Sequence, residues 1–196
     1  MSGKSKNGVL ISIRPQWCEL IARGKKKVEI RKTMPKLDQP FKCYIYCTSV
    51  KALNLADYVA VHARTGGRVD DWSTMVIGEF TCDWIEPIHV YRDGAVQNWM
   101  YAETDRSGLT YEEVAAYIGK EKTGYAWHIS DLKIYDHPKR LDDFQKPCPN
   151  AEKCSSCNYH YSGDWQYEPP HCVWDEVAES ALSRPPQSWC YVEVPE

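Results

Sequence analysis

Residues 24–32 read Gly24-Lys25-Lys26-Lys27-Val28-Glu29-Ile30-Arg31-Lys32, a stretch in which four lysines and one arginine surround a single carboxylate. Val28 and Ile30 are apolar and β-branched, which predicts a short strand from about Lys27 to Arg31 with those two side chains facing a core. Because successive residues of a strand alternate between its faces, Glu29 shares the opposite face with its charged neighbours. The stretch therefore predicts a strand with one apolar face and one charged face.

The charged face of this strand has two interpretations. A carboxylate held among cations stays ionised, and it can accept or relay a proton for a polar ligand. Charged residues are equally ordinary on a solvated sheet edge, where they discourage edge-to-edge pairing. Spacing alone leaves both interpretations open.

The spacing Gly24-x-Lys26-x-x-Glu29-x-Arg31 fits the GxKxxExR motif of the ASCH domain, a relative of the RNA-binding PUA fold. The preceding Ile11-Ser12-Ile13-Arg14-Pro15, with the helix after it, resembles the opening of that family. The stretch Pro185-Pro186-Gln187-Ser188-Trp189-Cys190-Tyr191-Val192-Glu193 resembles the closing strand of ASCH proteins common in bacteria and phages. The similarity covers most of residues 8–146 and 186–194.

The resemblance implies an α+β fold, a small PUA-like β-barrel flanked by helices. It implies one domain over residues 1–196, with residues 146–186 inserted before the last strand. Strands and helices of mixed order along the chain are compatible with this architecture. The strands expected from pattern are 8–13, 27–31, 41–48, 74–84 and 124–135. The expected helices are 15–23, with Gly24 just past its end, 51–65, 96–102 and 111–118. Thr110, with Glu113 three residues on, predicts a capping box at the start of the last helix.

Composition indicates a soluble globular protein, with 43% hydrophobic and 26% charged residues in a chain of 196. No run approaches the roughly 20 apolar residues that a membrane span needs. The N-terminus lacks the apolar segment of a secretory signal, and cytoplasmic localisation is expected. The net charge of −3 hides an asymmetry, because residues 1–36 carry +8 and the remainder −11. A basic patch on an acidic body can attract a polyanion, although it can also serve solubility alone.

Nine cysteines in a chain without a signal sequence indicate a reducing compartment, where clusters are metal sites or free thiols. Five of them lie in apolar patterns typical of a core, namely Cys18, Cys43, Cys47, Cys82 and Cys190. The other four, Cys148, Cys154, Cys157 and Cys172, have the spacing C-x5-C-x2-C-x14-C within a proline-rich segment. This pattern predicts a structural zinc site with those four as ligands, because the insertion has too little core to fold alone. His160 or His171 replacing a ligand, an iron–sulfur cluster and free thiols remain alternatives.

Nucleic-acid binding, with RNA as the first choice, is the leading hypothesis for function. The resemblance implies a cleft lined by the motif, in which cations neutralise phosphate, Glu29 accepts from a base amino group and a tryptophan stacks on a base. The expected ligand-binding residues are Arg14, Trp17, Lys26, Glu29, Arg31 and Lys32, with Trp72, Trp99 and Trp127 as further stacking candidates.

Two alternatives use the same residues. ASCH-fold acetylcytidine amidohydrolases are similar around the motif, but Glu29 stands where their nucleophilic threonine lies. A hydrolase acting on a modified nucleoside or on RNA would then use Lys26 and Glu29 as catalytic residues, with Glu29 as a general base through water. No histidine is placed near the motif by sequence. A nucleoside or modified-base sensor would use the same pocket, and its binding would respond little to salt.

Overall fold

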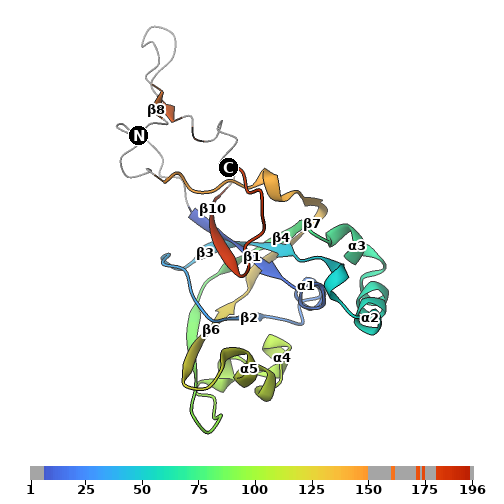
Figure 1. Cartoon of the computed structure of the whole chain (residues 1–196), viewed down its shortest axis with the longest axis vertical. Helices are drawn as coiled ribbons and strands as arrows, with labels where there is room; N and C mark the ends of the chain where they lie inside the picture. Colours follow the sequence, from blue (N-terminus) through green and yellow to red (C-terminus); the bar gives the residue numbers. More distant parts are fainter. Residues whose placement is uncertain (1–6, 150–159, 162–170, 173, 175–179, 195–196) are drawn as a thin grey trace.

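The computed structural model describes residues 7–149, 160–161, 171–172, 174 and 180–194 (Figure 1). The strands are β1 (Asn7–Ile13), β2 (Val28–Arg31), β3 (Phe41–Cys47), β4 (Val76–Cys82), β5 (Ile85–Val90), β6 (Lys122–His128), β7 (Ser130–Lys139), β8 (His160–Tyr161), β9 (His171–Cys172) and β10 (Trp189–Glu193). The α-helices are α1 (Pro15–Ala22), α2 (Leu55–Thr65), α3 (Arg68–Trp72), α4 (Thr104–Ser107) and α5 (Tyr111–Ile118). Short 3-10 turns lie at Val50–Ala52, Trp99–Tyr101 and Leu141–Asp143.

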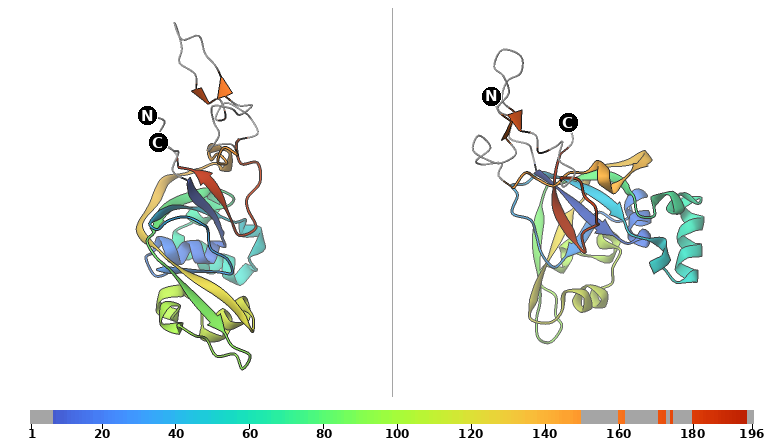
Figure 2. Two further views of the ribbon diagram at one scale, coloured as in Figure 1. Left: turned by 90° about the vertical axis from the view of Figure 1, so that its left-hand side faces the viewer. Right: turned by 45° about the horizontal axis from the view of Figure 1, so that its top comes forward.

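Two main sheets form the framework. The larger has the strand order β10-β1-β3-β4-β7, and the smaller has the order β2-β6-β5. The β1–β3 pair is parallel, and the other pairs in these sheets are antiparallel. Helices α2 and α3 lie beside the larger sheet, whereas α4 and α5 lie against the smaller one (Figures 1 and 2). A further pair, β8–β9, lies outside both sheets.

The expected closed barrel is wrong for the described residues, which form two open sheets of a mixed α/β fold. The reason lies in the segment predicted as one strand over residues 124–135. It forms two strands, β6 and β7, which belong to different sheets and are separated at Ile129. Asp131, just after the break, has a positive φ of 46°, a backbone region that a regular strand does not use. The chain thus bends from one sheet into the other instead of closing a single barrel.

Each sheet packs on its own apolar cluster. The cluster under the larger sheet includes Ile11, Cys43, Ile77, Phe80 and Trp127, all fully or almost fully buried. The cluster under the smaller sheet contains Val28 and Ile30 of β2, packed with Val114 and Ile118 of α5. The apolar face predicted for the motif strand is therefore confirmed, and it is α5 that covers this face.

Most predicted elements exist, with their ends shifted by a few residues. The capping box predicted from Thr110 and Glu113 is confirmed at the start of α5, and Gly66 in the left-handed region ends α2. The helix expected over residues 96–102 is wrong, because only the 3-10 turn Trp99–Tyr101 forms there. Strand β5 was not predicted. A proline at position 87 disfavours a strand by pattern, which is why the prediction missed it. In the structure, the Asn98 side chain donates a hydrogen bond to the Pro87 carbonyl at 3.0 Å.

Candidate nucleic-acid site

The motif strand is reached through a sharp turn after α1. Gly24 adopts a φ of +67°, which a glycine tolerates without the steric cost that a Cβ would bring. The backbone N–H groups of Lys25 and Lys26 then donate to the Leu20 carbonyl at 2.9 and 3.1 Å. This turn directs the Lys26 side chain back under the helix. Glu29, three residues on, pairs in register with Trp127 of β6.

Lys26, Glu29 and Arg31 form a continuous charge network, called here the motif triad. Lys26 Nζ lies 3.2 Å from Glu29 Oε2, and Arg31 Nη2 lies 3.0 Å from Glu29 Oε1. Each carboxylate oxygen thus meets one cation. Arg31 Nη2 also donates to the Ser12 carbonyl at 2.6 Å, which ties β2 to β1 of the larger sheet.

Burial distinguishes the motif triad from an ordinary surface ion network. Lys26, Glu29 and Arg31 expose only 2%, 6% and 7% of their surface, so the solvated-edge interpretation is wrong for these residues. Burial lowers the pKa of Lys26, and the neighbouring Glu29 carboxylate opposes that shift. A buried charge that loses its partner is strongly destabilising, so the three groups depend on one another. The triad is first of all a structural element that joins the two sheets.

The segment around α4 covers the triad on one side. Lys26 Nζ donates to the Ser107 carbonyl at 2.5 Å, and the Lys27 N–H donates to the Arg106 carbonyl at 2.7 Å. Gly108 lies against Leu20 and Trp17 of α1, since an added Cβ would lie 3.0 Å from the Leu20 side chain and 3.4 Å from the Trp17 ring. Lys26 Nζ in turn lies 5.5 Å from the Trp17 ring centroid, within cation–π range. Trp17 therefore covers Lys26 together with this segment.

Further polar atoms around the triad lack partners. Arg31 Nε and Trp127 Nε1 are buried, and neither forms a hydrogen bond to a described residue. The Arg31 Nη1 contacts to Ser188, at 3.4 Å to Oγ and 3.5 Å to the carbonyl, are long. The charged face of the motif strand therefore has buried N–H donors, on Arg31 and Trp127, that no described residue accepts from.

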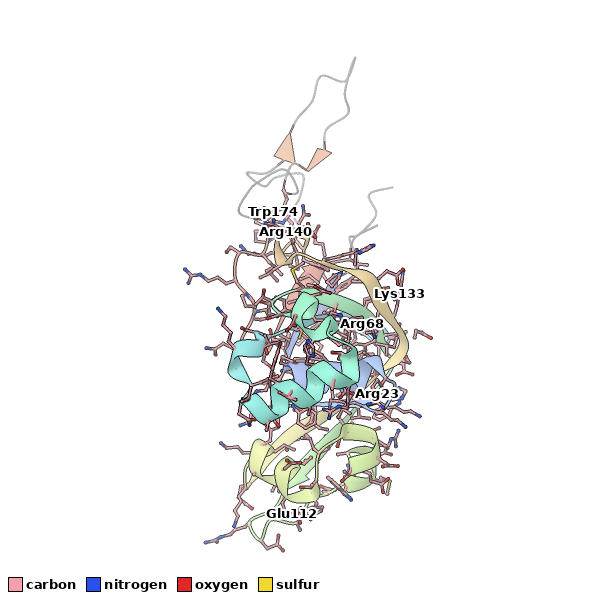
Figure 3. The ribbon with its side chains drawn as sticks, turned by 90° about the vertical axis from the view of Figure 1, so that its right-hand side faces the viewer. Arg23, Arg68, Glu112, Lys133, Arg140 and Trp174 are labelled. Carbon is pink, nitrogen blue, oxygen red and sulfur yellow. The ribbon has the colours of Figure 1, made fainter. Side chains whose placement is uncertain are left out.

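Exposed cations surround this closed network. Lys25 and Lys27 precede β2, Lys32 follows it, and Arg14 is the N-cap residue of α1; all four are exposed. Lys32 Nζ lies 5.1 Å from the ring centroid of Tyr117 on α5. Arg23, at the end of α1, is already paired with Glu19 at 2.8 Å, and it lies between the α2–α3 and the α4–α5 helices (Figure 3). The free basic rim is thus formed by Arg14 and the lysines beside β2.

The stacking candidates divide by burial. Trp72 and Trp127 expose 2% and 0% of their surface and belong to the apolar core. Trp99 is half-buried against the ring of Tyr111. Trp17 is half-buried and contacts Lys26, which leaves it the candidate nearest to the motif.

The structure also brings together four residues that sequence patterns did not place near the motif, called here the His128 cluster. His128 ends β6, directly opposite Val28 of the motif strand. Its Nδ1 lies 2.6 Å from Asp83 Oδ1, and its ring stacks on Trp84 at 4.7 Å with an interplanar angle of 8°. The Arg106 guanidinium lies 5.7 Å from the Trp84 ring centroid. Strand register and backbone hydrogen bonds, which a single sequence does not reveal, join these residues to the motif.

The predicted metal site is not tested. Cys154 and Cys157 lie outside the described residues, and of Cys172 only the backbone, in β9, is described. Cys148 is half-buried, and its N–H donates to Glu193 Oε1 at 3.2 Å. Among the described residues no group of three or more His, Cys, Asp or Glu side chains is arranged to hold a metal. Zinc bound by the four cysteines stays a prediction.

The core cysteines behave as predicted in four of five cases. Cys18, Cys43, Cys47 and Cys82 are fully buried, and Cys190 is half-buried. Burial raises the pKa of Cys18 and Cys43 well above the usual value, and it raises the pKa of Cys82 to about 12. These thiols are therefore small core residues and poor nucleophiles.

Comparison with known proteins gives one family. The sequence model of the ASCH domain matches residues 11–115. A crystal structure of a point variant of the ASCH protein from Zymomonas mobilis aligns with a TM-score of 0.54 and 16% identity, covering 95% of this chain and 89% of that chain. The unsubstituted Zymomonas mobilis ASCH protein aligns with a TM-score of 0.48 and 19% identity over 71% and 76% of the two chains. No curated protein sequence gave a match.

At 16% identity the structural likeness concerns the fold alone. No helix among the described residues is long and apolar enough to cross a membrane.

Proposed function

The chain belongs to the ASCH domain family, and on this premise we propose that it binds nucleic acid, RNA in the first place, along the basic rim of the motif strand. The observation that carries this proposal is the exposure of Arg14, Lys25, Lys27 and Lys32 around a closed triad. These cations are solvated, so they can neutralise phosphates without breaking an internal ion pair.

The proposal assigns different tasks to the rim and to the triad. Lys26 and Arg31 are engaged with Glu29 and with backbone carbonyls, so the first contact of a polyanion is with the rim. The triad fixes the position of β2 and hence the spacing of the rim cations. A ligand can contact Lys26 or Glu29 directly only if the segment around α4, which includes Ser107 and Gly108, moves away from the triad.

The test is binding of labelled RNA and DNA, single-stranded and duplex, across a salt series. Because each phosphate contact to a single strand contributes a slope of about −0.7 in log K against log salt, a Lys27→Ala/Lys32→Ala variant should lose up to about 1.4 of that slope. Its affinity for all sequences should fall alike. A flat salt response in the wild-type protein would overturn the proposal and favour a nucleoside sensor.

A matched control comes from β7, an edge strand of the larger sheet. Lys133 and Lys139 of β7 are exposed, and Lys133 is well separated from Arg23 in Figure 3. A Lys133→Ala/Lys139→Ala variant removes the same charge from another place. Its slope should equal that of the wild-type protein. Equal losses in the two variants would show that binding follows net charge and not the rim.

Hydrolysis is the second candidate, and the lowered pKa of Lys26 is the observation in its favour. An amine that loses its proton more easily can take part in proton transfer. Against it, both oxygens of Glu29 already accept from a cation. The binding mixtures should be checked for RNA cleavage, and N4-acetylcytidine should be tested for loss of its acetyl group. Product that disappears in Lys26→Met, while that variant stays folded, would establish an enzyme.

A further inference from the structure

The His128 cluster is joined to the basic rim by the backbone of a single residue. The Lys27 N–H donates to the Arg106 carbonyl at 2.7 Å, and the Lys27 carbonyl accepts from the Ile129 N–H at 2.9 Å. The His128 N–H donates to the Trp84 carbonyl at 3.1 Å. The exposed Lys27 side chain therefore starts from a point between Arg106 and the end of β6. The backbone of Lys27 thus links the rim to the His128 cluster.

The hydrogen bond to Asp83 decides which nitrogen of His128 carries a proton. A carboxylate only accepts, so Nδ1 of the imidazole must donate at the observed 2.6 Å. In the neutral ring Nε2 is then left with a lone pair, and no hydrogen bond from Nε2 to another described residue is present. The side chain of His128 is 22% exposed and that of Asp83 is 40% exposed. Asp83 thus keeps neutral His128 in the tautomer whose Nε2, at the surface, can accept a hydrogen bond.

The remaining members of the cluster restrict how the ring can move. Trp84 lies parallel to the imidazole, and Tyr101 packs edge-on against Trp84 at 5.6 Å. Arg106 is half-buried beside the same indole, and its Nη1 donates weakly to the Met100 carbonyl at 3.4 Å. The ring of His128 is consequently fixed by a stack and by a hydrogen bond, with a cation nearby. Such preorganisation is what a specificity contact needs.

From this arrangement we propose that the His128–Asp83 pair recognises the ribose 2′-hydroxyl of an unpaired RNA strand bound to the rim. The 2′-hydroxyl can donate to Nε2, and it is the group by which a protein distinguishes RNA from DNA. Arg106 and Lys27 contact the flanking phosphates, which are common to both nucleic acids. This inference rests on the proposed nucleic-acid binding and adds its selectivity for ribose.

The experiment compares three single strands of equal length and base order: RNA, DNA and 2′-fluoro RNA. The fluorine keeps an RNA-like sugar but cannot donate a hydrogen bond. Wild-type protein should bind RNA three- to tenfold more tightly than either analogue, as expected for one hydrogen bond. In His128→Phe the ring stack on Trp84 is kept and the acceptor is lost. That variant should bind all three strands with equal affinity and an unchanged salt slope.

Two further variants separate the role of Asp83 from that of Arg106. Asp83→Asn should weaken the preference for RNA, because the amide can stabilise the other imidazole tautomer. Arg106→Ala should lower the affinity for RNA and DNA by the same factor and leave their ratio intact.

His89 on β5 supplies the matched control. It is a half-buried histidine whose Nδ1 lies 3.1 Å from Thr123 Oγ1. His89→Phe should keep the full RNA preference. Equal affinity of the wild-type protein for RNA and DNA would overturn this inference. A preference for RNA that survives in His128→Phe would overturn it too. Either result would leave the proposed nucleic-acid binding intact. A wild-type protein that binds none of the strands would overturn both.

Discussion

The motif triad and the His128 cluster are both centred on a carboxylate paired with a nitrogen base, yet they differ in contact with water. In the triad, the Lys26 and Glu29 side chains are 2% and 8% exposed, whereas in the cluster the His128 and Asp83 side chains are 22% and 40% exposed. The groups of the first arrangement depend on one another, because losing one partner leaves a buried charge uncompensated. The second leaves its chemistry open to a ligand. The sequence motif thus marks the support of the site, and residues outside the motif complete its surface.

The largest expected effect is loss of the triad carboxylate. Glu29→Gln leaves two buried cations without a counter-ion and should lower the free energy of unfolding by about 3–5 kcal/mol. Glu79 on β4 is the matched control, because it also pairs with a lysine, Lys42 at 3.1 Å, but is 22% exposed. Glu79→Gln should cost about 1 kcal/mol or less. Urea unfolding at neutral pH measures both, and equal losses would contradict the distinction between the two networks.

Alkaline pH should destabilise the same closed interior. The pKa values of Cys18, Cys43 and Cys82 are raised by burial, so these thiols stay protonated in the folded protein. In the unfolded chain they ionise near pH 9, and the unfolded state then binds fewer protons. Stability therefore falls as the pH rises above about 9, by about 1 kcal/mol per thiol at pH 10.

The ionisation of Lys26 changes stability in the opposite direction as the pH rises. Its pKa is lowered, so above that lowered value the folded state has released a proton that the unfolded state still holds. One amine offsets one of the three thiols, and a net loss of stability remains. Denaturant unfolding from pH 8 to 10 under a reducing agent measures it. Stability that stays constant or increases would mean that the thiols are accessible.

The His128 cluster should tolerate the loss of its carboxylate charge, which the motif triad should not. Asp83→Asn should change the free energy of unfolding by less than about 1 kcal/mol, because exposed pairs contribute little. The same urea titration measures this change. A loss close to that of Glu29→Gln would show that the cluster is structural, and the difference between the two carboxylates would disappear.

Metal removal is expected to affect neither the motif triad nor the His128 cluster. If Cys148, Cys154, Cys157 and Cys172 bind zinc as their spacing predicts, the purified protein should contain one zinc per chain, and Cys157→Ser should lose it. The RNA affinity of the rim should stay unchanged, because the rim residues flank α1 and β2, far along the chain from these cysteines. Elemental analysis of both proteins decides the question. Protein free of metal would leave these cysteines as thiols.

Local patterns predicted the fold well where the chemistry is local. Alternation at Val28 and Ile30 gave the motif strand, and the Thr110–Glu113 spacing gave the start of α5. The bend between β6 and β7 was not predictable, because it depends on which sheet each half joins. The helix expected over residues 96–102 was wrong, because Val96 forms a β-bridge with Val90 and Asn98 adopts a positive φ of 58°, which a helix does not use.

The site shows the same limit. The motif identified Lys26, Glu29 and Arg31 as one group, but hydrophobic spacing does not reveal that charged residues are buried between two sheets. The proximity of His128 and Asp83, 45 residues apart, follows from the pairing of β5 with β6, which brings the turn between β4 and β5 beside the end of β6. Such contacts arise from tertiary pairing that no single-sequence pattern encodes.

Photo-crosslinking of a 4-thiouridine-labelled single-stranded RNA, followed by peptide mapping, tests the central claim most directly. The claim is that RNA lies on the exposed rim and reaches the His128 cluster. Crosslinks should appear in the peptides that contain Lys27 and Trp84, and they should weaken as salt rises. Crosslinks confined to β7, around Lys133 and Tyr135, would contradict this account and place the RNA at the β7 edge of the larger sheet.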